Sequence, residues 1–191
     1  MTASELHPEG WISVPVAENF ELRAKAVRAE RDRLYGNIYQ EQDTDARWVG
    51  DLGEHVFDSW FKHNKIAGYN WIQEDSAGAP DFVTSLGVRI GVKTVKRKVP
   101  PRGHYTAQIT AQHAQEPTEQ FFFMSYEINR KIMWLLGGVD KQTFLTHAVY
   151  HEGGQQGGQV HSSYTVREGH KIYNIAISKL MKPMDWLNQM N

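Results

Sequence analysis

Hydrophobic residues in the first third of the chain recur at the spacing expected for amphipathic helices. Over residues 16–35 they return at roughly three- to four-residue intervals, with Arg and Glu residues between them, which predicts one helix. Over residues 44–63 a second apolar face, rich in aromatic residues, predicts another helix. Asp43 or Thr44 supplies a side-chain oxygen that can cap the start of this second helix.

The middle of the chain changes to short runs of β-forming residues separated by turn residues. The predicted strands lie at residues 69–73, 81–84, 88–95, 105–110, 121–126, 131–136, 160–166 and 171–177. We expect the first four to form a meander, in which Ser85-Leu86-Gly87 is a tight turn that makes an antiparallel hairpin. The fifth and sixth runs are expected to pair with each other.

Two helices and a loop complete the predicted order of elements. A short helix is expected at residues 140–148, and a closing helix at residues 178–190 is expected to break at Pro183. The segment at residues 152–159, EGGQQGGQ, has too few apolar side chains to pack and predicts an exposed loop. The order favours an α/β or α+β protein, which we describe as an α/β fold with a central mixed β-sheet flanked by helices.

Composition limits how the chain is organised. A chain of 191 residues, 40% of them hydrophobic, can bury one sizeable core. We therefore expect one compact unit, with a helical N-terminal extension at residues 1–43 and a main domain at residues 44–191. No stretch approaches the roughly 20 apolar residues that cross a bilayer, and the first residues lack the pattern of a signal peptide, which predicts no membrane partner and a cytoplasmic location. The absence of cysteine excludes disulfides and thiolate metal sites.

Charge is informative only where it clusters, because the net charge of −1 gives no argument for a nucleic-acid partner. Residues 93–102 carry basic side chains and no acidic one. An earlier basic segment, residues 23–33, also contains Glu30 and Asp32, so a solvated helix face explains it equally well. The later segment is therefore the better candidate for contacts with phosphate groups.

Three short motifs carry the candidate chemistry. They are Gly50-Asp51-Leu52-Gly53-Glu54 in the second predicted helix, Pro80-Asp81-Phe82 at the start of a strand, and Gly91-Val92-Lys93-Thr94 on the next strand. Because side chains alternate across a strand, positions 91 and 93 share one face, where they can meet Asp81 on the paired strand. The order and spacing of these motifs resemble the PD-(D/E)XK nuclease superfamily.

The resemblance implies a restriction-endonuclease-like fold and a magnesium-dependent DNA endonuclease that hydrolyses phosphodiester bonds with an activated water. It implies that Asp81, an acid on the following strand and a main-chain carbonyl, here that of Val92, hold Mg²⁺ or Mn²⁺. It also implies that Lys93 orients the attacking water or helps to deprotonate it. Basic residues after the lysine would contact phosphates beside the scissile one; these are Lys96, Arg97, Lys98 and Arg102.

The resemblance extends over most of the chain from about residue 48 onward. Residues 121–144 and 173–187 resemble the later strands and the closing segment of phage-borne members, which implies a place in the cytoplasm of a bacterial host cell. Because many nucleases of this fold pair to cut both strands, a homodimer is compatible with the resemblance.

Gly91 departs from the family pattern, because it stands where Glu or Asp would supply a metal ligand. Three accounts are open. In the first, Asp81, the Val92 carbonyl and a migrated carboxylate hold the metal; Glu54 is the candidate ligand and catalytic residue, because the glycines of its helix allow a close approach to the sheet. In the second, a degenerate nuclease binds DNA or a protein partner without cleaving. In the third, an engineered change has inactivated the site.

Other candidate residues have simpler explanations. Asp51 and Asp58 are expected to be solvated acids on a helix surface. Tyr105 and Tyr126 are candidates for stacking on a base, although most aromatic residues are expected in the core. His113 can approach the site but is left out of the metal ligands, because single histidines are more often surface or core residues.

The catalytic hypothesis predicts a specific arrangement of three side chains. It requires Asp81 and Lys93 to lie side by side on adjoining strands, with the carboxyl group of Glu54 leaning in from the helix. A hypothesis of a different class is a protein-interaction module that uses the first helix, and its sign would be an exposed apolar stripe on that helix.

Overall fold

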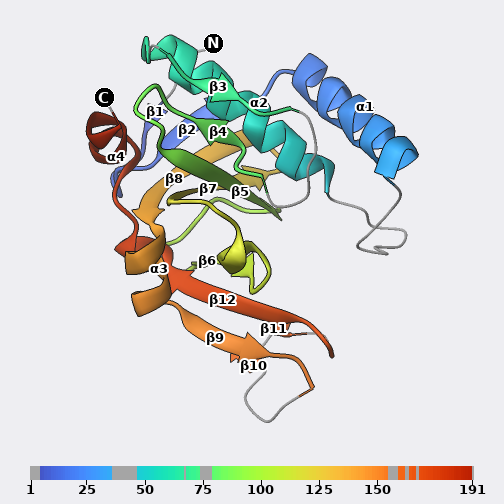
Figure 1. Ribbon diagram of the computed structural model, residues 1–191, viewed down its shortest axis with the longest axis vertical. Coiled ribbons are helices and arrows are strands. Elements are labelled where there is room, and N and C mark those ends of the chain that lie inside the picture. The colour runs from blue at the N-terminus through green and yellow to red at the C-terminus, as the bar shows by residue number, and fades with distance from the viewer. Residues whose placement is uncertain are drawn as a thin grey trace.

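The computed structural model describes residues 5–35, 47–66, 68–73, 79–154, 159–161, 164–166 and 168–190. Its elements form three layers (Figure 1): helices on one side, a central sheet, and a smaller sheet on the other side. The central sheet contains both parallel and antiparallel neighbours. The predicted α/β class with a central mixed sheet is therefore confirmed.

Seven strands of the described residues form the central sheet in the order β1-β2-β8-β7-β5-β4-β3. Their bounds are Glu5–Leu6 (β1), Ile12–Pro15 (β2), Asn70–Trp71 (β3), Phe82–Val83 (β4), Arg89–Arg97 (β5), Gln120–Glu127 (β7) and Ile132–Asp140 (β8). Strands β5 and β7 are parallel, and the other neighbours are antiparallel. The predicted β4–β5 hairpin is confirmed: Gly87 N donates to Thr84 O at 2.9 Å, and the φ of 81° at Gly87 suits glycine.

Helix α2 (Trp48–His63) covers one face of the central sheet, and α1 (Glu18–Tyr35) lies against α2 (Figure 1). Both helices were predicted from the spacing of apolar residues. Apolar side chains of α2 pack on Ile90 and Val92 of β5, and α4 (Pro183–Gln189) adds Trp186 to this helix-side core. The candidate caps Asp43 and Thr44 lie outside the described residues.

A second core lies between the central sheet and a three-stranded sheet of order β6-β12-β9, with bounds Thr106–Thr110 (β6), Lys171–Ala176 (β12) and Val149–Glu152 (β9). Phe121 and Phe123 of β7 point into this core, where Ile109 and Ile175 of the smaller sheet meet them. The remaining elements are η1 (His113–Gln115), α3 (Lys141–His147), β10 (Gln159–His161), β11 (Tyr164–Thr165) and η2 (Ile177–Lys179).

Four local predictions are corrected by the structure. Strand β6 leaves the expected meander and pairs with β12, because its buried residues belong to the second core. Residues 1–43 are more than a helical extension, since β1 and β2 join the central sheet next to β8. The single strand expected at residues 160–166 is the β10–β11 pair. Pro183 begins α4 instead of breaking a helix, because the first helical position needs no N–H donor.

Candidate functional site

Asp81 lies directly before β4, with its carboxylate held against β5. Its backbone N–H donates to Ile90 O at 3.0 Å, which aligns the residue with β5. Its Oδ2 atom accepts a hydrogen bond from the Val92 N–H at 2.6 Å. Because the N–H and C=O of one strand residue point to the same side of the strand, the Val92 carbonyl faces this edge too.

Lys93 lies beside Asp81, on the face of β5 that points away from α2. The distance from its Nζ to Asp81 Oδ2 is 4.0 Å. Ile90 and Val92 point into the helix-side core, so strand alternation directs Gly91 and Lys93 to the opposite face. A Cβ placed on Gly91 would lie 3.5 Å from Lys93 Cε, so positions 91 and 93 share one face as predicted.

Glu116 is a third charged residue at this place, and it was not predicted. It follows η1 on the segment that leads into β7, and its Oε2 lies 3.7 Å from Lys93 Nζ. Its Oε1 lies 3.7 Å from His113 Nε2. The side chains of Lys93 and Glu116 are 17% and 14% exposed, so both charges are largely withdrawn from water. One ammonium group therefore lies within ion-pair distance of two carboxylates.

Burial and neighbouring charges shift the titration of this cluster. Burial raises the pKa of Glu116; the Lys93 ammonium opposes this effect, and the Asp81 carboxylate reinforces it. Burial and the Lys93 charge lower the pKa of His113 to about 4, so its ring is neutral at pH 7. His113 Nδ1 lies 2.9 Å from the Thr110 hydroxyl, which fixes the ring. His113 approaches the site as expected, but as a neutral neighbour.

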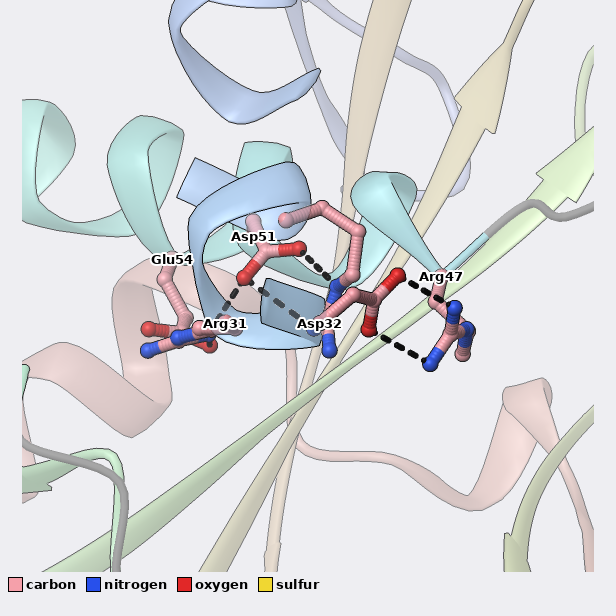
Figure 2. Close-up of polar contacts among 6 residues, drawn as sticks. Arg31, Asp32, Arg47, Asp51 and Glu54 are labelled. Carbon is pink, nitrogen blue, oxygen red and sulfur yellow. Dashed lines mark hydrogen bonds and ion pairs between the residues drawn. The ribbon is translucent and has the colours of Figure 1, made fainter. Parts of the chain in front are cut away.

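The carboxyl group of Glu54 makes its polar contacts on the helix side of the sheet. Its Oε2 accepts a hydrogen bond from Trp71 Nε1 at 3.1 Å, and its Oε1 lies 3.7 Å from Arg31. Figure 2 shows Arg31 between the carboxylates of Glu54 and Asp51. Burial raises the pKa of Glu54 to about 8, and the Asp81 charge adds to this, while Arg31 and Trp71 oppose it. Glu54 and Asp81 therefore sense each other electrostatically, but the contacts of the Glu54 carboxyl are with Arg31 and Trp71.

The raised pKa of Glu54 predicts a pH-dependent stability that Glu54→Gln removes. The folded protein holds a proton here up to about pH 8, whereas an unfolded chain releases it near pH 4.5. The stabilisation is complete below pH 4.5 and is lost as the pH rises through 8. The free energy of unfolding of Glu54→Gln, relative to that of the wild type, should therefore rise by on the order of a few kcal/mol between pH 5 and pH 8.

Urea denaturation at pH 5, 6.5 and 8 in EDTA measures this gain for Glu54→Gln. The difference between the two proteins reports Glu54 and the charges coupled to it, because titrating groups far from it contribute equally to both. A constant difference across the three pH values would contradict the raised pKa.

A partly buried network of ion pairs joins α1 to α2 (Figure 2). Asp51 on α2 has a side chain only 1% exposed, and it pairs with Arg28, at 2.8 Å, and with Arg31, both on α1. Near the start of α2, Arg47 pairs with Asp32 at 2.6 Å. These contacts fix α1 on the helix layer and position Arg31 beside the candidate site.

Two acids of α2 are buried, so the prediction of solvated side chains was wrong. Asp51 is neutralised by the two arginines from α1. Asp58 is 8% exposed; it accepts a hydrogen bond from the Tyr69 hydroxyl at 2.8 Å and pairs with Lys62 at 2.7 Å. The charges of both acids are therefore taken up by contacts within the protein.

Asp51→Asn is expected to lower the free energy of unfolding by about 2 kcal/mol, because it removes the charge that holds Arg28 and Arg31. The loss stays below that of a fully buried pair because both arginines reach solvent. Urea denaturation provides the measurement. Glu30→Gln, which breaks the exposed pair with Arg33, is the control and should leave the midpoint unchanged. Equal midpoints for Asp51→Asn and the wild type would contradict a stabilising role for the ion pairs of Asp51 with Arg28 and Arg31.

Three of the four predicted phosphate-binding residues are exposed: Lys96, Lys98 and Arg102. Within the described ranges, their side chains make no ion pair, so their charges stay open to an outside anion. Strand alternation, however, directs Lys96 to the face opposite Lys93. The basic segment therefore presents charge on more than one side of the sheet.

Arg97 and Tyr126 both make contacts inside the protein. The Arg97 guanidinium lies 4.5 Å from the Tyr105 ring and donates to Thr106 O at 3.1 Å, which ties β5 to β6. The Tyr126 ring is completely buried, and its hydroxyl donates to Glu21. Base stacking by Tyr126 is therefore ruled out in this fold, and Arg97 already covers the ring of Tyr105.

Comparison with known proteins gives no match, either to a family model or to a curated protein. In the part of the chain that the structure describes, no helix combines the length and apolar character needed to cross a membrane. The same residues contain no cluster of three or more His, Cys, Asp or Glu side chains arranged to hold a metal ion. Asp81, Lys93 and Glu116 form the charged cluster of the candidate site.

Proposed function

We propose that the protein is a metal-dependent endonuclease that hydrolyses phosphodiester bonds in DNA. The observation that carries the proposal is the pairing of Asp81 with Lys93, whose charged atoms lie 4.0 Å apart on adjoining segments of the sheet. A carboxylate that can bind a cation, next to an ammonium that can orient an anion or a water, suits phosphodiester hydrolysis.

A restriction-endonuclease-like fold is part of this proposal. Its support is the antiparallel run β3-β4-β5, the parallel pairing of β5 with β7, and the packing of α2 on β5. This arrangement puts the carboxylate and the lysine at the end of a short hairpin, where a phosphate backbone can approach.

The oxygen atoms at the site fit Mg²⁺ or Mn²⁺. Mg²⁺ commonly binds one or two protein carboxylates and completes its shell with water and substrate phosphate oxygens. The Asp81 carboxylate and the Val92 carbonyl would be protein ligands, and the 2.6 Å hydrogen bond from Val92 N holds the carboxylate at this edge. When bound, the ion would supply positive charge that stabilises the charge developing on the phosphate.

Lys93 would orient the attacking water and balance the negative charge of the neighbouring carboxylates. Its ammonium has three N–H donors, and it is held between Asp81 and Glu116 before any substrate binds. A donor that is already in place needs little reorganisation during the reaction. Glu54 would act from the helix side as a positioning residue, because its carboxyl is engaged by Arg31.

DNA would be held by the exposed basic side chains Lys98 and Arg102, which follow β5 in the chain, whereas Lys96 points to the face of the sheet opposite Lys93. Such contacts reach phosphates on either side of the site and carry no sequence information. Affinity for DNA should therefore fall as the salt concentration rises.

A second candidate function is DNA binding without cleavage. Gly91 favours it, because the position expected to supply a second acid has no side chain. In that case the exposed basic residues would still give salt-dependent binding, and neither Mg²⁺ nor Mn²⁺ would produce cleavage.

Incubation with supercoiled plasmid in Mg²⁺, Mn²⁺ or EDTA separates the two functions. Cleavage that requires both the ion and Asp81 supports the endonuclease. Retention of DNA without cleavage in either ion supports the second function.

A further inference from the structure

We propose that Glu116 supplies the second metal-binding carboxylate that Gly91 lacks. This inference rests on the proposed function, and it assigns the ligand to a different element from Glu54, the candidate expected from the sequence. Glu116 lies within 3.7 Å of Lys93, on the face of the sheet that points away from α2. The polar contacts of Glu54, in contrast, are with Trp71 and Arg31 on the helix side.

Lys93 lies within ion-pair distance of both Asp81 and Glu116. Its Nζ lies 4.0 Å from one carboxylate and 3.7 Å from the other, so one positive centre is shared by two acids. A divalent cation can be shared in the same way, with water and phosphate completing its shell. The long, flexible stem of lysine allows the ammonium to turn toward the substrate when the ion enters.

The lack of a side chain at Gly91 and the position of Glu116 are complementary. A Cβ on Gly91 would lie 3.1 Å from Thr118 Cγ2 and 3.4 Å from Phe121 Cδ1. The segment that carries Glu116 thus packs into the space that an acid at position 91 would enter. A side chain at position 91 would press against this segment, and glycine allows the segment to approach β5 closely.

The Glu116 segment is anchored on both sides, so its carboxylate is held in place before an ion binds. Lys141 Nζ donates to Glu116 O at 2.7 Å, and Glu119 N donates to Arg89 O of β5 at 2.9 Å. Between these anchors, Thr118 is 2% exposed, and its buried hydroxyl makes no hydrogen bond within the described residues. A ligand on a fixed segment loses little conformational freedom on binding.

Binding of Mn²⁺ in the absence of DNA tests the inference, with free Mn²⁺ measured by its paramagnetic resonance signal. The proteins are the wild type, Asp81→Asn, Glu116→Gln and Glu119→Gln. Glu116→Gln is expected to weaken Mn²⁺ binding by about tenfold or more, as Asp81→Asn does. Glu119 is the matched control, because it is an exposed acid on the same segment that pairs with Arg89; its variant should bind as the wild type does.

The outcomes distinguish the two proposals. If Asp81→Asn loses Mn²⁺ while Glu116→Gln keeps wild-type affinity, the inference is overturned and the proposed function survives. If the wild type binds no Mn²⁺, or if Asp81→Asn binds it equally well, both fail.

Thermal unfolding in EDTA checks that each variant is folded. Should Glu116→Gln not fold, Glu116→Asp provides the test, because it keeps the charge but withdraws the oxygens by one methylene group. This variant is expected to bind Mn²⁺ more weakly than the wild type, and wild-type affinity would overturn the inference.

Discussion

Asp81→Asn is expected to slow metal-dependent cleavage of DNA about a thousandfold with little effect on folding. A catalytic cation contributes several kcal/mol of transition-state stabilisation, and each ~1.4 kcal/mol corresponds to a factor of ten in rate. The neutral amide is a poor ligand for a cation, but its oxygen can still accept the N–H of Val92, so the link to β5 is retained. The measurement is the initial rate of plasmid cleavage in Mg²⁺ or Mn²⁺.

Two further variants make this result specific. Asp185→Asn removes an exposed acid from α4 and should cleave at the wild-type rate. Lys93→Met removes the ammonium but keeps an apolar stem of similar length. It should cleave slowly yet bind Mn²⁺ at least as tightly, because a positive charge no longer competes for Asp81 and Glu116. Equal rates for Asp81→Asn and the wild type would show that another site, or a contaminating nuclease, cuts the plasmid.

Local patterns were sufficient to predict the half of the site that lies on one hairpin. The spacing of apolar residues predicted α1 and α2, and Ser85-Leu86-Gly87 predicted the turn that brings Asp81 next to Lys93. Helix periodicity, strand alternation and tight turns all depend on residues that are close in the chain. For that reason the shared face of positions 91 and 93 followed from the sequence as well.

Contacts between segments that are distant in the chain could not be predicted from these local patterns. Glu116 reaches Lys93 only because β5 pairs in parallel with β7, and the sequence around it has no period or motif that indicates this pairing. Strand β6 has the composition of its predecessors, yet it pairs with β12, because sheet membership depends on packing. Strand β2 was missed, since its short run joins the sheet only through β8.

The burial of Asp51 was missed for a related reason. An acid that faces solvent and an acid that pairs with a neighbouring helix can occupy the same position in the helix pattern. Which of the two occurs depends on the side chains that the neighbouring helix places beside the acid. Here α1 presents Arg28 and Arg31, which the sequence equally allowed to be a solvated basic face. Because Arg31 also reaches Glu54, this tertiary contact changes the expected role of the helical glutamate.

A large loss of stability is expected at Gly53, where α2 meets β5. A Cβ on Gly53 would overlap Thr94 Oγ1, and it would lie 2.9 Å from Thr94 Cβ and 3.1 Å from Met124 Cε. Rotation of the threonine side chain can move its hydroxyl, but its Cβ is fixed to the strand backbone. The helix must therefore move outward, and Gly53→Ala should lower the free energy of unfolding by about 3 kcal/mol.

Gly50→Ala is the matched control, because a Cβ at Gly50 would meet no atom within 4 Å. Alanine there should raise the free energy of unfolding by up to about 1 kcal/mol, since it favours the helical conformation. Opposite signs in urea denaturation would locate the close approach at Gly53, whereas a gain at both positions would contradict the packing of α2 on β5. Gly53 and Thr94 are the chain neighbours of Glu54 and Lys93. An outward shift of α2 therefore also moves Glu54 away from Lys93. For this reason Gly53→Ala should cleave DNA more slowly than Gly50→Ala.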